Sequence, residues 1–349
     1  MTDSTMKTIT INTSHRYDVL IGNGLLKKTG ELILKIHPPC KIAIISDTNV
    51  APLYMNEVKR SLNRTGFNVC DYVFKAGEKS KNMDTLFMIL EFLADAEITK
   101  TDLILALGGG VVGDIAGFAA SIYLRGINFV EMPTTLLAAV DSSVGGKTGV
   151  NLPSGKNLVG AFHQPIRVIC DTDTLKSLPE INIADGIAEA IKYGLLGNVK
   201  ILEVLDNYNE TIYEAVTTKA SFVEKDEFNT NFRNFLNLGH TIGHAIEKCS
   251  NYSISHGHAI AAGMSIITKA FEKLGYTNPG TSENLKKLLA RYNLPITSNF
   301  SSSELYEVAL KDKKRSGDTF TLVVPISLHK WELRTIPISD LKAIIELGL

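Results

Sequence analysis

The segment that most constrains the fold is residues 103–114, LILALGGGVVGD. Five apolar residues, three glycines and a further apolar run are typical of a buried strand that turns directly into a helix. Glycines let the backbone approach a phosphate closely, and the helix start supplies N–H donors. The spacing is not that of the standard dinucleotide fingerprint, so a tight strand–helix turn without a ligand is the alternative. Asp114 comes shortly after these glycines. It could contact a ribose hydroxyl, or it could be an ordinary acidic residue in the first turn of the helix.

The pattern around this segment predicts two domains. Strands are expected at 8–13, 17–21, 41–46, 67–74, 102–107, 129–132 and 166–170, and helices at 50–64, 83–96 and 113–123. Such alternation indicates right-handed βαβ units and a parallel sheet. Later in the chain, helices are expected at 183–196, 201–206, 211–225, 232–248, 259–274 and 282–292, then a hairpin (319–325 with 331–337) and a helix from 340. We therefore expect an α/β domain over residues 1–179 and a mainly α-helical domain over 180–349.

Composition excludes several classes of function. A 44% share of apolar residues and a 21% share of charged residues are ordinary for a globular protein. The net charge of −1 gives no bulk attraction to nucleic acid or to a membrane. Apolar runs are too short to span a bilayer, and the N-terminus has no apolar signal core. The four cysteines are scattered, as in proteins with reduced thiols. We expect a cytoplasmic protein.

Histidines are concentrated in one short stretch. Four of the eight, His240, His244, His256 and His258, fall within nineteen residues. Neutral imidazole is the commonest protein metal ligand and a common general acid or base near pH 7. The first two are four residues apart in a helical pattern, which places them on one helix face. A pair without a flanking acid is a weak motif, so satisfied surface or core histidines are the alternative.

Two predicted helices offer charged partners for the histidines. Glu189 and Lys192 are three residues apart among apolar neighbours, so both charges are expected to meet a partner. A carboxylate with two histidines and an open position is a standard catalytic zinc set. The alternative is an i,i+3 surface ion pair. Arg233, Asn237 and His240 are spaced as one face of a helix, and a polar stripe of this kind indicates a site rather than a core contact.

A second glycine-rich segment lies at residues 142–148, SSVGGKT. It lacks the spacing of a nucleoside-triphosphatase loop. Lys147, Lys156 and Asn157 nevertheless offer two cations and an amide to an anion. Solvated surface lysines are the alternative, although loops of this composition often carry function.

These motifs together resemble one known family. They are GGGVVGD (108–114), YLRG (123–126), PTT (133–135), DSSVGGKT (141–148), GKN (155–157), AEAIKY (188–193), LNLGHTIGH (236–244) and DKK (312–314). The same motifs occur in this order in 3-dehydroquinate synthases, and the resemblance runs from about Asp47 to Lys314. It implies the dehydroquinate synthase-like fold, in which an N-terminal nucleotide-binding α/β domain and a helical C-terminal domain have the site between them.

The resemblance also implies a reaction. The substrate would be the sugar-acid phosphate 3-deoxy-D-arabino-heptulosonate 7-phosphate, and the products 3-dehydroquinate, an intermediate of the shikimate pathway, and phosphate. The cofactors would be NAD and a divalent metal, Zn²⁺ or Co²⁺. The steps would be a transient oxidation, β-elimination of phosphate, reduction, ring opening and an intramolecular aldol closure. A homodimer is implied, because family members contribute Arg125 to the neighbouring subunit's site.

Site residues are carried over from the motifs. The metal ligands would be Glu189, His240 and His256, which gives His244 a substrate-facing role in place of metal binding. The other catalytic residues would be Lys147, Asn157, Lys192, Arg233 and Asn237. Further substrate contacts would be Arg125, Asp141, Lys219, Lys313 and Lys314. The NAD contacts would be Asp47, Asn49, Glu78, Lys81, Gly109, Gly110, Val111, Asp114, Thr134, Thr135, Lys156, Thr174 and Ser177.

The chain departs from the family pattern near two of these residues. Upstream of Arg233, the family usually has an acid and a glycine where this chain has Asn229 and Asn231. Asn229 cannot act as a carboxylate, and the nearby Asp226 is a hypothetical substitute, as is Glu227. The family's usual glutamate after His-Gly is replaced by His258.

Three alternative functions follow from the same observations. The first is another sugar phosphate cyclase, acting on sedoheptulose 7-phosphate or glucose 6-phosphate. Those substrates lack a carboxylate, which disfavours them where Arg233 and Lys219 are present. The second is a metal-dependent polyol dehydrogenase, and the third an inactive metal-binding scaffold, suggested only by Asn229 and His258.

Overall fold

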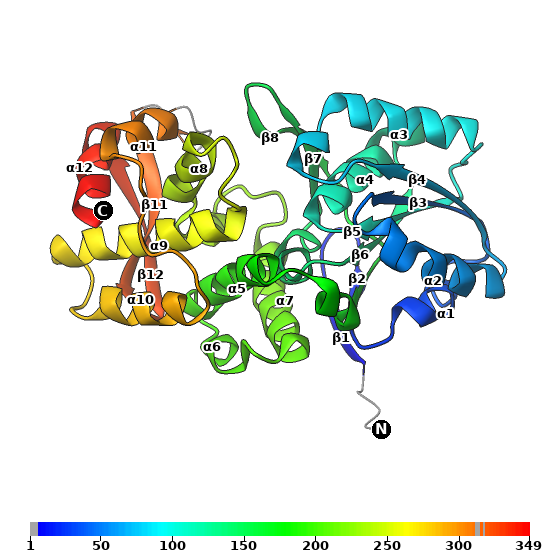
Figure 1. The fold of residues 1–349 in the computed structure, drawn as a ribbon, viewed down its shortest axis with the longest axis horizontal. Helices are drawn as coiled ribbons and strands as arrows, with labels where there is room; N and C mark the ends of the chain where they lie inside the picture. Colours follow the sequence, from blue (N-terminus) through cyan, green and yellow to red (C-terminus); the bar gives the residue numbers. More distant parts are fainter. Residues whose placement is uncertain (1–5, 311–314, 317) are drawn as a thin grey trace. The chain divides into compact units, whose positions relative to one another are not determined.

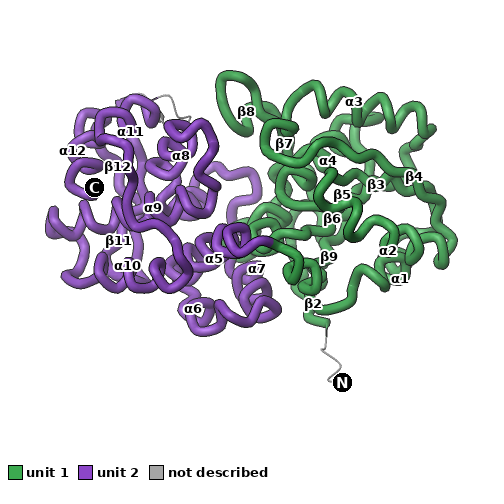
Figure 2. The backbone as a smooth tube through the Cα atoms, in the orientation of Figure 1, with its two compact units in different colours: residues 1–178, 219–224 green, residues 179–218, 225–349 purple. Residues whose placement is uncertain are grey.

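The computed structural model describes residues 6–310, 315–316 and 318–349. The chain divides into two compact units (Figure 2). Unit 1 contains the chain up to Leu178 together with Lys219–Glu224, and unit 2 contains Pro179–Thr218 and Lys225–Leu349. The short return of the chain to unit 1 was not expected from the sequence.

Unit 1 is built on a seven-stranded sheet in the order β1-β2-β9-β6-β5-β3-β4 (Figure 1). The strands are β1 (Lys7–Ile11), β2 (Tyr17–Gly22), β3 (Lys41–Asp47), β4 (Asn68–Phe74), β5 (Leu103–Gly108), β6 (Asn128–Pro133) and β9 (Arg167–Asp171). Only the β1–β2 pair is antiparallel, and the other pairs are parallel. The predicted mostly parallel sheet is therefore confirmed.

Helices cover both faces of this sheet because its central strands are apolar on both sides. In β5, Leu103 and Leu105 face the core of α1 (Thr29–Leu34) and α2 (Ala51–Arg64). Ile104 and Ala106 face the core of α3 (Met83–Asp95) and α4 (Gly110–Ile122). Alternate residues of β3 divide between the two cores in the same way.

Two local features of unit 1 differ from the sequence prediction. Helix α4 begins at Gly110, three residues before the expected position 113, so the glycine turn itself forms the start of the helix. The second glycine-rich segment leads into an antiparallel hairpin, β7 (Lys147–Leu152) with β8 (Gly155–Phe162), where the sequence pattern predicts a loop. Val150, buried in this hairpin, joins the core beneath α3 and α4.

Unit 2 is mainly helical, as predicted. Its helices are α5 (Glu180–Leu195), α6 (Lys200–Val204), α7 (Tyr208–Lys225, which includes the segment counted with unit 1), α8 (His240–Cys249), α9 (His256–Lys273), α10 (Thr281–Arg291), α11 (Ser302–Ala309) and α12 (Ile338–Gly348). Strands β10 (Arg315–Ser316), β11 (Thr319–Ser327) and β12 (Lys330–Pro337) form a small sheet. Helix α9 packs against α5, α8, α10 and α12, which makes it the central element of this unit (Figure 1).

The expected single helix over 232–248 is wrong. Residues Phe232–Asn237 form a 3₁₀ helix, η6, and α8 starts afresh at His240. The break is at Gly239, whose φ of 75° lies in the left-handed region that glycine adopts without a steric penalty. Arg233, Asn237 and His240 therefore do not share one helical face.

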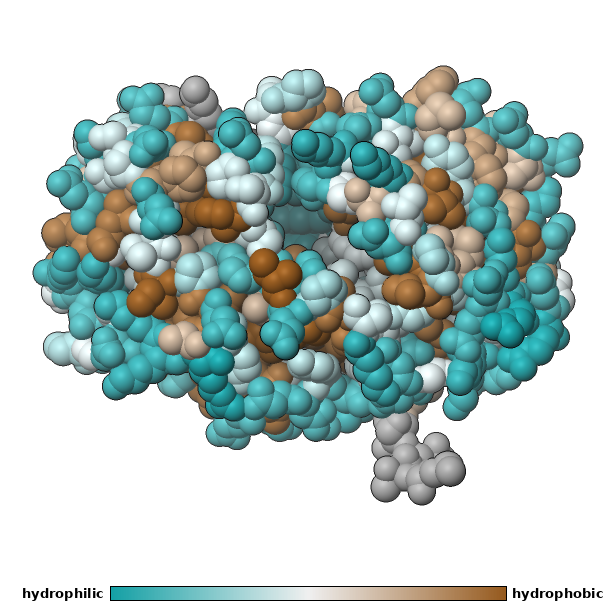
Figure 3. Space-filling model, in the orientation of Figure 1, coloured by the Kyte–Doolittle hydropathy of each residue, from teal (hydrophilic) through white to brown (hydrophobic). Residues whose placement is uncertain are grey.

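No helix in the described part of the chain is long and apolar enough to cross a membrane. On the face drawn in Figure 3, exposed apolar residues are interspersed with hydrophilic ones.

Candidate active site

Three helices of unit 2 each supply one potential metal ligand. Glu189 lies in α5 and is completely buried, whereas His240 and His256 are the first residues of α8 and α9. The structure thus brings together the three residues that the family resemblance selected, although they span 68 positions of the chain, from 189 to 256 counted inclusively.

Close contacts at glycines allow these helices to approach one another. A Cβ atom added to Gly257 in α9 would lie 2.3 Å from Cα of Asp185 in α5. A Cβ atom added to Gly263 in α9 would lie 2.2 Å from the carbonyl oxygen of Gly239, which precedes α8. Both neighbours are backbone atoms that cannot rotate away, so the separation of the three helices depends on these glycines.

The donor atoms fit a tetrahedral metal ion. One ligand atom from each of Glu189, His240 and His256 lies within 4.8 Å of the others. The distance to Glu189 Oε1 is 3.4 Å from His256 Nε2 and 3.8 Å from His240 Nε2. Ligands about 2.1 Å from a tetrahedral Zn²⁺ are about 3.4 Å apart, so the two pairs that include Glu189 are already close to this spacing. One carboxylate and two imidazoles also match the chemistry of catalytic zinc sites.

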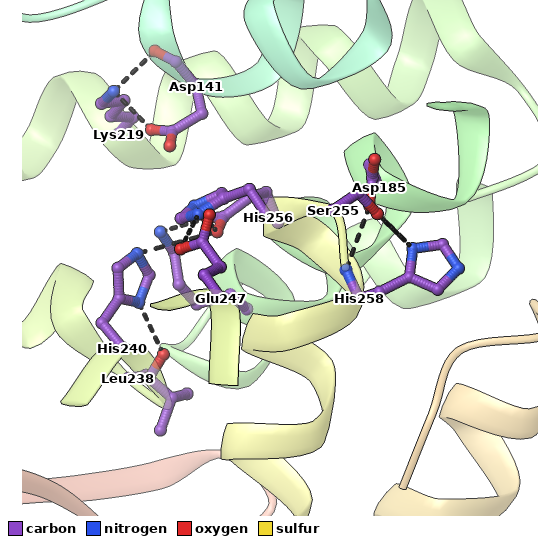
Figure 4. Close-up of polar contacts among 11 residues, drawn as sticks. Asp141, Asp185, Lys219, Leu238, His240, Glu247, Ser255, His256 and His258 are labelled. Carbon is purple, nitrogen blue, oxygen red and sulfur yellow. Dashed lines mark hydrogen bonds and ion pairs between the residues drawn. The ribbon is translucent and has the colours of Figure 1, made fainter. Parts of the chain in front are cut away.

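Outer contacts orient both imidazoles for binding through Nε2 (Figure 4). His240 Nδ1 lies 2.9 Å from the carbonyl oxygen of Leu238, and His256 Nδ1 lies 3.2 Å from Glu247 Oε2. Each acceptor requires a proton on Nδ1, so a metal ion would bind through Nε2 in place of any proton there. Glu247 is buried, and the sequence interpretation assigned it no role. The available signal was an acid three residues after His244, directly after the apolar residues Ala245 and Ile246.

Two further residues predicted for the site, His244 and Lys192, lie beside this donor set. The ring of His244 is centred 5.4 Å from that of His240 and 6.0 Å from that of His256. Lys192 Nζ forms an ion pair with Glu189, and the two side chains are 2% and 0% exposed, so the alternative of a surface ion pair is wrong. Burial lowers the pKa of His256, but Glu189 and Glu247 outweigh it and raise the pKa to about 10.

A tightly bonded loop before η6 holds Arg233. Asp226 accepts hydrogen bonds from the backbone N–H groups of Thr230, Asn231 and Arg233, at 2.7, 2.9 and 2.9 Å. Burial opposes ionisation of Asp226, but these bonds outweigh it and hold its pKa well below the usual range. A carboxylate of this kind is a poor proton carrier near neutral pH, which argues against Asp226 as the substitute for the acid missing at Asn229.

We expect Asp226→Asn to destabilise the protein at pH 7 by an amount that shrinks in acid. Because the folded-state pKa is lowered, the carboxylate stabilises the fold above its unfolded pKa of about 3.9 and loses that effect as pH falls toward the folded-state value. Denaturant unfolding of both proteins at pH 7, 4 and 3 measures the difference. A difference in unfolding free energy that is constant across these pH values would contradict this account.

The predicted nucleotide-binding residues of unit 1 gather at one edge of its sheet. The chain passes from β3 to β4 on one side and then to β5 on the other, which makes the carboxyl ends of β3 and β5 a topological switch point, where ligands bind in such sheets. The predicted residues lie at the carboxyl ends of parallel strands: Asp47 at the end of β3 and Asn49 after it, Glu78 after β4, Gly109, Gly110 and Val111 after β5, Thr134 and Thr135 after β6, and Thr174 and Ser177 after β9.

The glycine turn at this edge is lined by hydroxyl groups. A Cβ atom on Gly109 would lie 2.9 Å from Thr135 Cγ2, and one on Gly110 would lie 3.0 Å from Ser142 Oγ. The buried hydroxyls of Thr134 and Ser142 have no hydrogen-bond partner among the described residues. Polar atoms of this kind beside a helix start fit a phosphate-containing ligand. Ser142 is a candidate that the sequence interpretation did not single out.

A polar cluster lies beside the same helix start. The buried Lys81 Nζ forms an ion pair with Asp114 and lies 2.6 Å from Asn157 Oδ1. Asp114 is therefore paired with a lysine rather than acting only as a first-turn acid. Glu78 accepts a hydrogen bond from Asn151 Nδ2 at 2.8 Å, and Lys156 Nζ lies 3.8 Å from the same carboxylate oxygen.

Three other residues predicted for the site, Lys219, Lys147 and Arg125, lie in other parts of unit 1. Lys219 Nζ donates to the carbonyl oxygen of Asp141 at 2.5 Å and also pairs with its carboxylate (Figure 4). Lys147 is the exposed first residue of β7. Arg125 is exposed and lies after the end of α4, toward the amino end of β6, so it is not part of the nucleotide edge. Lys313 and Lys314 lie outside the described residues.

Beneath α4 lies a buried acid that was not predicted. The carboxylate of Glu131 in β6 is next to Gly113, where a Cβ atom would lie 2.2 Å from its Oε1. Burial, together with the nearby Asp114, raises the pKa of Glu131 to about 8. Burial thus favours the uncharged form of Glu131.

Comparison with known proteins agrees with these observations. The family models for the 3-dehydroquinate synthase N-terminal and C-terminal regions match residues 71–185 and 186–315. The 3-dehydroquinate synthase of Streptococcus suis (strain 05ZYH33) is 42% identical over 338 residues, which cover 93% of this chain and 95% of that protein. The 3-dehydroquinate synthase of Clostridium kluyveri is 42% identical over 332 residues, covering 91% of this chain and 92% of that protein.

A solved structure extends the comparison to the fold. A 2-deoxy-scyllo-inosose synthase complexed with carbaglucose-6-phosphate, NAD⁺ and Co²⁺ is 26% identical, with a TM-score of 0.88, covering 98% of this chain and 100% of that one. The dehydroquinate synthase-like fold expected from the motifs is thereby confirmed. The chain belongs to the 3-dehydroquinate synthase family.

Proposed function

We propose that this protein is a 3-dehydroquinate synthase, a lyase that converts 3-deoxy-D-arabino-heptulosonate 7-phosphate to 3-dehydroquinate and phosphate. One observation carries the proposal: Glu189, His240 and His256 place three ligand atoms close enough together to bind one metal ion. The chain that holds them is 42% identical to a 3-dehydroquinate synthase. The net reaction releases phosphate without net oxidation or reduction.

Unit 2 would hold the divalent metal through Glu189, His240 and His256. When bound, Zn²⁺ or Co²⁺ supplies Lewis-acid polarisation of the C5 oxygen of the substrate. The contacts of Leu238 and Glu247 fix the two imidazoles in the tautomer that binds through Nε2. Lys192 is buried beside Glu189, and its ammonium group would donate a hydrogen bond to the substrate at the metal site.

Unit 1 would hold NAD at the carboxyl edge of its sheet. When bound, NAD⁺ supplies the acceptor for the C5 hydride and, as NADH, returns that hydride later in the cycle. Gly109 and Gly110 leave room for the pyrophosphate, and the hydroxyls of Thr134 and Ser142 provide hydrogen bonds to it. Asp114 and Lys81 form a buried pair next to this helix start. The other contacts proposed are those carried over from the family motifs.

The remaining predicted residues would bind the substrate. Arg233 suits the carboxylate because a planar guanidinium pairs with it through two hydrogen bonds, and Lys219 is a second cation for this group. We assign Lys147, Asn157, Asn237 and His244 to the phosphate and the reacting alcohol. The leaving phosphate would itself remove the proton made acidic by the neighbouring ketone. Residues that hold the reacting ends close then favour the final ring closure.

The same resemblance suggests assembly and location. We propose a homodimer in which Arg125 reaches the partner's site, acting in the cytoplasm. The exposure of Arg125 away from the nucleotide edge of its own unit supports this assignment.

The direct test is phosphate release from the heptulosonate phosphate. We expect phosphate and 3-dehydroquinate in equal amounts, no lasting absorbance change at 340 nm, and loss of turnover on treatment with a chelator or removal of NAD. Readdition of Zn²⁺ or Co²⁺ should restore activity. Glucose 6-phosphate and sedoheptulose 7-phosphate serve as control substrates.

Each alternative predicts a different result. Preferential phosphate release from either control substrate would assign the protein to another cyclase activity. Net formation of NADH without phosphate release would indicate a polyol dehydrogenase. No turnover of any substrate in the metal-loaded protein would favour the scaffold alternative.

A further inference from the structure

Three polar residues beside the metal ligands have no role in the proposed reaction. Asp185 is buried in α5, and its Oδ1 accepts hydrogen bonds from Ser255 Oγ at 2.7 Å and from the backbone N–H of His258 at 3.0 Å. His258 Nδ1 lies 2.8 Å from the same oxygen and 3.0 Å from Ser255 Oγ (Figure 4). A carboxylate oxygen can only accept, so Nδ1 carries the proton.

This network caps α9 from a different helix. Ser255 is the N-cap residue of α9, but its side chain makes no capping hydrogen bond within that helix. Its hydroxyl instead bonds to Asp185, and Asp185 accepts the N–H of His258, the third residue of α9. The four N–H groups at a helix start lack partners within the helix, and a nearby carboxylate also interacts favourably with the helix dipole.

The network joins the segments that carry two metal ligands. Asp185 lies one helical turn before Glu189 in α5, and His258 lies two residues after His256 in α9. Gly257 packs against the backbone of Asp185, so the two helices are in direct contact at this point. A displacement of Asp185 would thus change the separation of Glu189 and His256.

We propose that Asp185, Ser255 and His258 are positioning residues that fix His256 against Glu189 for metal binding. The proposal rests on the proposed metal site. It also gives His258 a function: at a position where glutamate would form a capping box with Ser255, this chain has histidine and obtains the carboxylate from α5 instead.

The proposal predicts a specific rescue. Asp185→Ala should weaken Co²⁺ or Zn²⁺ binding by about 10-fold, the lower end of the range for loss of a contact made directly to a ligand, because Asp185 acts on His256 only through Ser255 and His258. His258→Glu alone places a second carboxylate next to Asp185, and the repulsion between them should also weaken metal binding. In the double variant D185A/H258E, the introduced carboxylate would complete a capping box with Ser255 within α9, and at least part of the lost affinity should return. Metal dissociation constants are measured by competition with a chromophoric chelator.

A matched control separates metal positioning from general loss of stability. Ser301 is the N-cap of α11 and forms a capping box with Glu304, with neither residue in the metal-binding group. Ser301→Ala should lower the melting temperature while leaving the metal dissociation constant unchanged. If D185A does not fold, Asp185→Asn, which keeps one acceptor oxygen, should show a smaller loss of affinity.

Two results would overturn the inference and are distinct from failure of the proposed function. Unchanged metal affinity in the folded D185A variant, or in D185N if only that variant folds, would show that the network does not position the ligands. A loss equal in D185A and in D185A/H258E would show that capping of α9 is not the cause. Absence of metal binding in the unmodified protein would instead refute the metal site itself.

Discussion

Glu189→Gln is expected to abolish turnover and to weaken metal binding by more than about 100-fold, beyond the range for outer-shell changes. Glutamine keeps the size of the side chain, but its amide oxygen is a far weaker ligand for a divalent cation than a carboxylate. The carboxylate is completely buried and is the only acid in the donor set it forms with His240 and His256, although Glu247 with His244 and His256 forms a second possible group among the described residues. Metal content after dialysis and phosphate release measure the two effects.

Glu247→Gln is the matched comparison for this substitution. It preserves all three ligands and changes only the acceptor for His256 Nδ1, so a smaller loss of metal affinity, about 10- to 100-fold, is expected. Full metal content and full turnover in the Glu189→Gln protein would exclude Glu189 as a ligand.

Lys192→Met is expected to cause the largest loss of stability, about 3–5 kcal/mol in the metal-free protein. Lys192 and Glu189 form an ion pair with side chains that are 2% and 0% exposed. Removal of one member of a buried pair is strongly destabilising because the charge of the other loses a partner in a poorly solvating environment, although His240 and His256 remain near Glu189. Denaturant unfolding in the presence of a chelator measures the free energy.

The double variant K192M/E189Q tests the cause. It removes both charges, so the metal-free double variant should be more stable than Lys192→Met alone. It should still fail to bind metal, which separates the stability of the pair from ligation. Equal destabilisation in the single and double variants would show that packing of the lysine stem, and not charge, is responsible.

The sheet of unit 1 could be predicted well because its strands are short, apolar and separated by amphipathic helices. Residues 103–107 are apolar throughout, and each face of this strand proved to be covered by a helical layer. The β7–β8 hairpin was missed because glycines and polar residues at 145–157 weaken the alternating pattern on which strand prediction depends.

The residues of the candidate site are harder to predict from local sequence patterns. Helical spacing suggested His240 with His244 as ligands, and the family resemblance was needed to select Glu189 and His256. The apparent polar stripe from Arg233 to His240 was misleading because Gly239 breaks the helix. Long-range contacts such as Lys81 with Asp114 and Asn157, or Asp185 with His258, join segments whose proximity no local pattern encodes.

The origin of the three proposed metal ligands on separate helices has a consequence for the stability of the protein in the cell. A bound ion would act as a removable cross-link, closing chain loops of 52 residues from Glu189 to His240 and 17 from His240 to His256, counted inclusively. Free metal at 1,000 times its dissociation constant would add about 4.1 kcal/mol to folding stability. The concentration of free metal ion would thus influence not only catalysis but also the resistance of unit 2 to proteolysis.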